Sequence, residues 1–163
     1  MVKGPRRIGS FVGLFVVSAA LAGCNSLLSS SAPPAPAVPA VAPSNLPASQ
    51  FVGSWGLASY HRAEDRERTE KEAKGQCGKP YVIGAGPNGG IMMHLADQAT
   101  PSELALKGGD GGRTFIGPAN EAAGGVDDRE VIQTSADSFT TRWVDADNAQ
   151  RYGTMVYERC KGK

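Results

Sequence analysis

The sequence predicts a mainly β protein. The expected fold is a single small antiparallel barrel or meander of about eight strands with one short charged helix or loop, after a signal peptide and a disordered linker. Two observations lead to this fold class. From residue 51 onward, short runs of strand-forming residues are separated by turn residues, several at the 8 to 12 residue spacing of a barrel. The segment 51–163 also has about 113 residues, enough for one domain and too few for two.

Eight segments have the composition of strands. In the fourth, Leu104 and Leu106 lie on one face and Lys107 lies on the other. Alternation after residue 128 is poor, so the inward-facing residues are not assigned there, and Asp127 and Asp128 are interpreted as turn residues. The segment ADNA is interpreted as the connection between the last two strands. In chain order, the expected strands are FVGSWGLASY, PYVIG, GIMMHLA, SELALKG, RTFIG, REVIQT, SFTTRWVD and QRYGTMVYERC.

The segment 63–75, AEDRERTEKEAKG, differs from the rest of the domain. It is rich in helix formers and carries opposite charges four residues apart, such as Glu67 with Lys71 and Glu70 with Lys74. It has almost no apolar face. We therefore expect either a solvated helix or an extended loop.

The glycines of PYVIGAGPNGG spell G-x-G-x-x-G after a strand-like run, as in dinucleotide-binding sites. Such a site needs a long helix after the glycines and a parallel strand–helix–strand unit. Here Pro101 leaves room for at most two or three helical turns, and no second strand–helix pair follows. Pro87-Asn88-Gly89 is favourable turn chemistry. We therefore expect a hairpin turn.

The N-terminus has the pattern of an export signal. Lys3, Arg6 and Arg7 precede an apolar run over residues 8–20, which is too short to span a membrane comfortably. The run ends in LAGC, which resembles a bacterial lipobox. The resemblance implies that residues 1–23 are a lipoprotein signal peptide and that Cys24 is lipidated and becomes the mature N-terminus. Residues 24–50 are then a lipid-anchored linker rich in Pro, Ala and Ser.

The same resemblance predicts where the protein is located. The residue after Cys24 is Asn25, not the aspartate that often retains lipoproteins at the inner membrane, so we expect a lipid-anchored protein of the bacterial outer membrane that faces the periplasm. Removal of residues 1–23 takes away three of the seventeen Lys and Arg and leaves the mature chain at about −2. This balance gives no basic surface for nucleic acid.

The lipobox accounts for one of the three cysteines. Cys77 and Cys160 remain as an even pair in an oxidising compartment, and we expect them to form a disulfide that closes most of the domain. The alternative is two buried free thiols.

Gly53-Ser54-Trp55 on the first expected strand resembles the G-x-W signature of the calycin barrels, which include lipocalins, avidins and bacterial alkaline-protease inhibitors. In those families the tryptophan closes one barrel end and a basic residue from a late strand packs over it. The resemblance implies that Arg159 has this role, with Arg151 as the alternative.

The residues suggest a binding protein that is not an enzyme. His61 and His94 are the only histidines, and no catalytic motif, metal-ligand set or cofactor motif is present in the sequence. We expect non-catalytic binding of a small apolar or amphipathic ligand, or of an envelope partner. The alternatives are inhibition of a secreted protease by the stretch around residues 45–50, and a structural envelope role with a filled barrel core. The candidate ligand-binding residues are Trp55, Phe139, Trp143, Tyr157 and Arg159.

Overall fold

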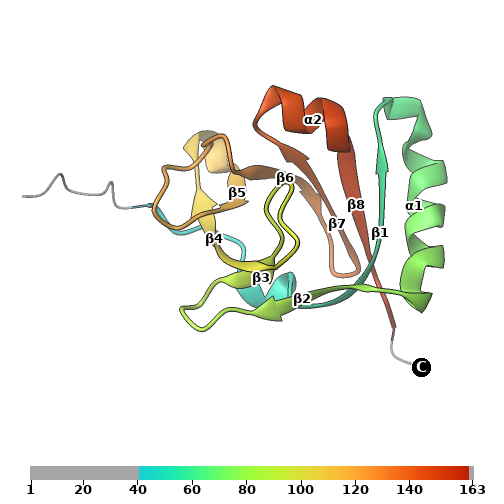
Figure 1. Cartoon of the computed structure of the whole chain (residues 1–163), viewed down its shortest axis with the longest axis horizontal. Coiled ribbons are helices and arrows are strands. Elements are labelled where there is room, and N and C mark those ends of the chain that lie inside the picture. Colours follow the sequence, from blue (N-terminus) through green and yellow to red (C-terminus); the bar gives the residue numbers. More distant parts are fainter. Residues whose placement is uncertain (1–40, 162–163) are drawn as a thin grey trace, which may run out of the picture. The chain divides into compact units, whose positions relative to one another are not determined.

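The computed structural model describes residues 41–161, so the predicted signal peptide, Cys24 and most of the linker lie outside the described residues. Eight antiparallel strands form a closed barrel in which each strand pairs with the next and the last strand, β8, pairs with the first, β1 (Figure 1). The predicted fold class is confirmed.

The strands are β1 (Gly53–Tyr60), β2 (Tyr81–Ala85), β3 (Ile91–Met93), β4 (Ser102–Gly108), β5 (Thr114–Gly117), β6 (Arg129–Thr134), β7 (Ser138–Trp143) and β8 (Thr154–Arg159). The α-helices are α1 (Arg66–Gly75) and α2 (Ala146–Tyr152). Four 3₁₀ turns are η1 (Ala48–Gln50), η2 (Ala63–Asp65), η3 (Gln76–Gly78) and η4 (Asp110–Gly112). Within residues 41–161, no helix is long and apolar enough to cross a membrane.

Aromatic rings fill the middle of the barrel. The Phe139 ring stacks on Tyr157 with centroids 4.2 Å apart, and it meets Phe51 and Trp55 edge-on at 5.0 and 4.7 Å. These are favourable aromatic geometries, and each large ring removes much apolar area from water. The buried core consists of Phe51, Trp55, Ile83, Ile91, Met93, Leu104, Ile116, Phe139 and Tyr157.

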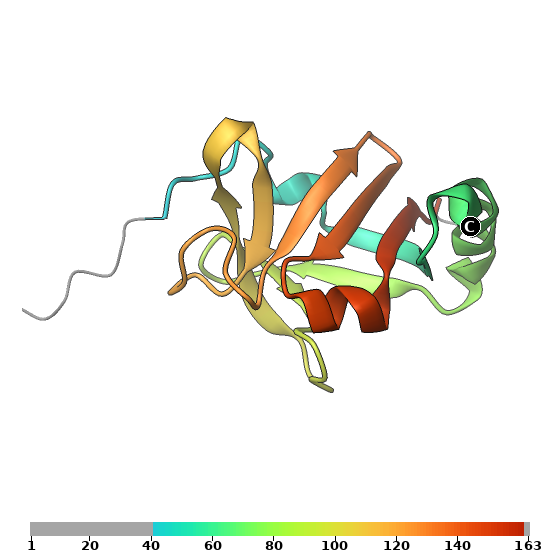
Figure 2. The ribbon, with the colours of Figure 1, turned by 90° about the horizontal axis from the view of Figure 1, so that it is seen from above.

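The charged segment forms the helix α1, which packs along β1 and β8 on the opposite side of the barrel from β4 and β5 (Figure 1, Figure 2). The helix is not fully solvated, because Thr69 and Ala73 are buried on one narrow face. Gly56 of β1 permits this close approach, since a Cβ there would lie 1.9 Å from the carbonyl oxygen of Ala73. Small residues therefore replace the apolar stripe that the segment lacks.

The predicted disulfide is present. Cys77 in η3, just after α1, bonds to Cys160, just after β8, with the two Cα atoms 5.5 Å apart. The Cys160 amide also donates to the Ser54 carbonyl at 2.9 Å. The bond therefore joins the ends of α1 and β8 next to the start of β1.

The glycine-rich segment forms the predicted hairpin between β2 and β3. The carboxylate of Glu103, from β4, accepts hydrogen bonds from the amides of Asn88 and Gly90 at 2.8 and 3.0 Å. Burial raises the pKa of Glu103. The two backbone donors and the Asn88 side chain together lower it by more than burial raises it, so the net shift of the pKa is downward. The loop amides thus bind an anion that belongs to the protein itself.

Asp128 is not the surface turn residue that the sequence suggested. Its carboxylate is fully buried and lies 2.5 Å from the equally buried Nζ of Lys107. The segment 118–128 folds over the outer wall of β4 and covers this pair. Lys107 also donates to the carbonyl groups of Pro118, Glu121 and Ala122, and Asp128 accepts from the amides of Gly124 and Gly125.

ADNA lies in the connection between the last two strands, as expected, but the expected last strand, QRYGTMVYERC, begins too early. Residues 146–152 form α2, and the strand begins only at Thr154. Asp145 caps the helix by accepting the Asn148 amide at 2.8 Å, and Gly153, with φ of 69°, ends it. This helix lies at the end of the barrel where β7 ends and β8 begins (Figure 1).

Candidate functional site

One end of the barrel, called here the closed end, is sealed by Trp55 and Arg159. The Arg159 guanidinium lies 4.1 Å from the Trp55 ring. Its Nε, Nη1 and Nη2 donate to the carbonyl groups of Ala136, Val52 and Gln50 at 3.1, 3.3 and 2.7 Å. Trp55 donates its indole N–H to the Phe51 carbonyl at 2.7 Å. Arg159 therefore occupies the position that the G-x-W resemblance implies for a late basic residue.

The structure also explains why the first residue of the G-x-W stretch is glycine. Gly53 has φ of 144°, and a Cβ there would lie 2.9 Å from the Arg159 guanidinium. A side chain at this position would disturb the stack of Arg159 on Trp55.

The stretch around residues 45–50 belongs to the closed end. Leu46 and Ala48 pack against the barrel core, and η1 lies just before the fully buried Phe51. Gln50 donates its side-chain amide to the Thr134 hydroxyl at 2.6 Å. This stretch is therefore held against the barrel.

The opposite end, called here the open end, contains a pocket of about 250 Å³. It lies where β6 begins, β7 ends and β8 begins, between α2 and the segment 94–101. Its walls are mainly aromatic and apolar. They include Tyr81, Leu95, Trp143, Tyr152 and Met155.

An ionic contact joins the two sides of the open end. Asp97, in the segment 94–101, accepts hydrogen bonds from the Tyr152 hydroxyl at 2.7 Å and from Arg151 at 2.5 Å, both on α2. The hydrogen bond from Tyr152, followed by that from Arg151, lowers the pKa of Asp97. Arg151 is therefore engaged here and does not pack over Trp55.

His94 and Tyr81 form a fixed pair inside the rim. The Tyr81 hydroxyl accepts the His94 backbone amide at 3.0 Å and lies 3.1 Å from His94 Nδ1. One hydroxyl thus orients both the backbone and the ring of His94.

Arg129 lies beneath this pocket and is only 3 % exposed. Its guanidinium stacks on Trp143 at 4.2 Å, Nη2 donates to the His94 carbonyl, and Nη1 lies 4.0 Å from the Met93 sulfur. Its Nε has no hydrogen-bond partner in the described part of the chain. No ion pair among residues 41–161 includes Arg129.

Two further buried polar atoms beside Arg129 are without a hydrogen-bond partner among the described residues. They are the Trp143 indole nitrogen and the Thr141 hydroxyl. Leaving such an atom unsatisfied costs about 1–3 kcal/mol. Burial also raises the pKa of nearby Tyr157 to about 12, although Arg129 acts to lower it. The open end therefore contains polar groups that the barrel itself does not satisfy.

The five residues proposed from the sequence do not gather at one site. Trp55, Phe139 and Tyr157 are packed into the filled core, and Arg159 seals the closed end. Trp143 is the one of the five that lines the open-end pocket.

Sequence reasoning missed Arg129 and Thr141. A signal was available, because Arg129 lies two residues before Val131, which packs against the core, and therefore shares its inward face. The β-bulge between Val131 and Gln133 interrupts the alternation of inward and outward residues, so the sequence pattern of the strand does not show which residues face inward.

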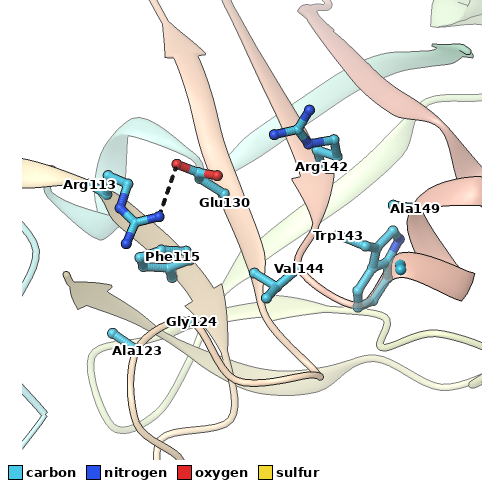
Figure 3. A pocket seen from close by; sticks show the side chains of 10 residues that line it. Arg113, Phe115, Ala123, Gly124, Glu130, Arg142, Trp143, Val144 and Ala149 are labelled. Atoms are coloured by element: carbon cyan, nitrogen blue, oxygen red, sulfur yellow. Dashed lines mark ion pairs between the residues drawn. The ribbon is translucent and has the colours of Figure 1, made fainter. Parts of the chain in front are cut away.

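A second, larger groove of about 580 Å³ lies on the outer wall of β5, β6 and β7 (Figure 3). Phe115, Glu130 and Arg142 are cross-strand neighbours there, and Arg113 lies 4.0 Å from Glu130. Figure 3 shows Trp143 at one edge of the groove beside Ala149 of α2. The arginine and glutamate charges in this groove are exposed or partly exposed, so solvent screens them.

Comparison of the chain with protein families, with curated proteins and with solved structures found no match. Within the described residues, no group of three or more His, Cys, Asp and Glu side chains is placed to hold a metal ion.

Proposed function

We propose that this protein is a lipid-anchored envelope protein whose barrel binds a small amphipathic molecule at its open end without catalysing a reaction. The observation that carries the proposal is the difference between the two ends. The closed end is sealed by hydrogen-bonded side chains, whereas the open end contains an apolar pocket above polar atoms that lack partners. A ligand with an apolar body and a polar group would complement both features.

The anchor part of the proposal rests on the sequence. LAGC supports lipidation of Cys24, and Asn25 supports the outer membrane with the barrel in the periplasm. Residues 42–50 contact the barrel, so the tether is the part of the linker over residues 24–40, which at about 3.1 Å per residue would hold the barrel up to about 50 Å from the bilayer. Such a tether would leave the open end accessible to molecules in the periplasm.

The size of the pocket limits the ligand. Its volume of about 250 Å³ lies just below the ~300–1,000 Å³ typical of sites for drug-sized ligands. The aromatic core beneath it is filled, which prevents a ligand from extending along the barrel axis. The ligand is therefore small and lies at the rim.

The two alternatives have less support. A structural envelope role requires a filled barrel, and only the middle and the closed end meet this condition. Protease inhibition by the stretch around residues 45–50 requires that stretch to leave the barrel. Leu46, Ala48 and Gln50 instead make contacts that close it.

The test is native mass spectrometry of residues 25–163, recovered without detergent from the envelope of the exporting cell. This segment contains all eight strands and both disulfide cysteines. We expect a discrete extra mass that disappears on denaturation. Ala96→Trp, at the open end, should abolish it, whereas Ala123→Trp, in the outer groove, should retain it. A bare mass in the unsubstituted protein would contradict ligand binding.

A further inference from the structure

We infer that Arg129, with Trp143, binds the single negative charge of a small carboxylate amphiphile at the open end. This inference rests on the proposed function, because it assigns the head group of the ligand proposed for the same pocket. It concerns the open-end pocket, which shares Trp143 with the outer groove of Figure 3, whereas Arg129 lines only the open-end pocket.

The first step is the uncompensated charge. Arg129 is 3 % exposed, and arginine stays protonated in proteins. A buried charge is normally paired, because taking it out of water is costly. Asp128, its chain neighbour, faces the outer wall, where it pairs with Lys107. Asp97 lies at the rim and is engaged by Arg151 and Tyr152. Neither nearby carboxylate therefore neutralises Arg129.

The second step is the grouping of donors. Arg129 and Trp143 are direct cross-strand partners, and Thr141 pairs with Val131 one step further along the same inward face. Side chains at such positions lie within ~5–8 Å of one another. Arg129 Nε and the Trp143 indole N–H are therefore two neighbouring donors without a hydrogen-bond partner in the described part of the chain, and both side chains line the pocket.

The third step is the chemistry of the missing partner. A carboxylate offers two oxygens with about four acceptor positions and carries one negative charge. It matches the planar fork of arginine and can accept from an indole donor as well. A buried water could accept from some of these donors, but it would leave the positive charge of Arg129 without a counter-charge.

The fourth step is the apolar part of the ligand. Tyr81, Leu95, Met155 and Tyr152 line the pocket beside Arg129 and would contact a short apolar chain or ring. The pocket is small, so the chain must be short. A medium-chain acid such as octanoate has the required combination of one negative charge and a compact apolar tail.

The test measures binding of octanoate and of octanol, its uncharged counterpart, to residues 25–163 by isothermal titration calorimetry. We expect octanoate to bind at least tenfold more tightly than octanol. Arg129→Met should remove this preference while octanol binding is retained. Arg113→Met, an exposed arginine in the outer groove, serves as the matched control and should keep the preference. Circular dichroism would establish that each variant is folded.

A second measurement uses only the unsubstituted protein, in case Arg129→Met does not fold. In ¹H–¹⁵N spectra, octanoate should shift the Trp143 indole N–H and octanol should shift it less, while the Trp55 indole, bonded to Phe51, stays unchanged. Equal affinities for octanoate and octanol would overturn the assignment of Arg129 but leave the proposed function intact. Failure of both compounds to bind, together with a bare native mass, would overturn both proposals.

Discussion

The two ends of the barrel each contain an arginine stacked on a tryptophan, at nearly the same distance. Arg159 lies 4.1 Å from Trp55 at the closed end, and Arg129 lies 4.2 Å from Trp143 at the open end. At the closed end, all three guanidinium nitrogens and the indole N–H donate to backbone carbonyl groups. At the open end, Arg129 Nε and Trp143 Nε1 have no partner in the described residues.

This difference shows that an arginine stacked on a tryptophan does not by itself indicate whether the pair is structural or binds a ligand. A cation over an aromatic ring contributes about 0.5–2 kcal/mol at either end. What distinguishes the ends is whether the remaining donors are satisfied. The closed end is a structural seal, because its donors are used within the chain. The open end has donors left over, and this is the basis for proposing a ligand there.

The largest predicted effect on stability comes from removing the disulfide at the closed end. Replacing Cys77 and Cys160 together by serine should lower the free energy of unfolding by about 4–5 kcal/mol, because the bond closes a loop with a sequence separation of 83. Urea unfolding followed by circular dichroism measures the loss. The single variant Cys77→Ser should lose a similar amount. A loss below about 1 kcal/mol would show that the bond adds little to the hydrogen bonds of the closed end.

The next prediction makes the same substitution at both ends. Arg159→Met should lower the free energy of unfolding by about 3–4 kcal/mol, because three backbone carbonyl groups lose a charged donor. Arg129→Met should change it by no more than about 1 kcal/mol in either direction without ligand. Removing an uncompensated buried charge offsets the lost stacking and the lost hydrogen bond to the His94 carbonyl. Urea unfolding of the two variants side by side measures the difference. Equal losses would show that Arg129 is as structural as Arg159 and would remove the basis of the comparison.

A third prediction concerns Tyr157, which stacks on Phe139 and lies near Arg129. Burial raises the pKa of its hydroxyl from 10.0 to about 12. Between these values the unfolded chain releases the phenolic proton and the folded protein retains it, so stability falls as pH rises. The contribution reaches about 2.3 kcal/mol at pH 12. Urea unfolding at pH 9 to 12 measures the slope, and Tyr157→Phe should reduce it. An unchanged slope in that variant would assign the alkaline loss to other groups.

The sequence was sufficient to predict the closed end. Cysteine counting paired Cys77 with Cys160, and the calycin resemblance of the G-x-W stretch implied a tryptophan covered by Arg159, with Arg151 as the alternative. The first signal is compositional and the second rests on the family resemblance. They name the partner residues without requiring the path of any loop.

The open end could not be predicted in the same way, because its features depend on long-range placement. The β-bulge after Val131 obscures the alternation from which the inward face of Arg129 could have been read. Whether Arg129 lacks a counter-charge depends on Asp128 turning toward Lys107. The loop over residues 118–128 determines that second contact. The glycine-rich hairpin shows the same limit, since its local pattern predicted the turn but not that Glu103 would accept hydrogen bonds from its amides.

The smallest predicted effect concerns the rim of the open end. Asp97→Asn should leave the midpoint of thermal unfolding unchanged, because the contact with Arg151 and Tyr152 is exposed to solvent. It should instead speed hydrogen exchange of the amides in the segment 94–101, which would lose the charged contact that ties it to α2. Acidification should have the same effect on the protein without the substitution. The contact lowers the pKa of Asp97, so it persists at pH values below 3.8, the usual pKa of an aspartate, and is lost as pH falls through the lowered pKa.

Asp65→Asn is the matched control for this variant. Asp65 is another aspartate with a lowered pKa, held by Arg62 and Arg68 beside α1 and away from the open end. It should leave exchange in the segment 94–101 unchanged. If Asp97→Asn also had no effect there, the packing of Leu95 and Tyr152 would suffice to hold the rim. The two ends would then differ only in their buried donors, with no contribution from a tethered rim.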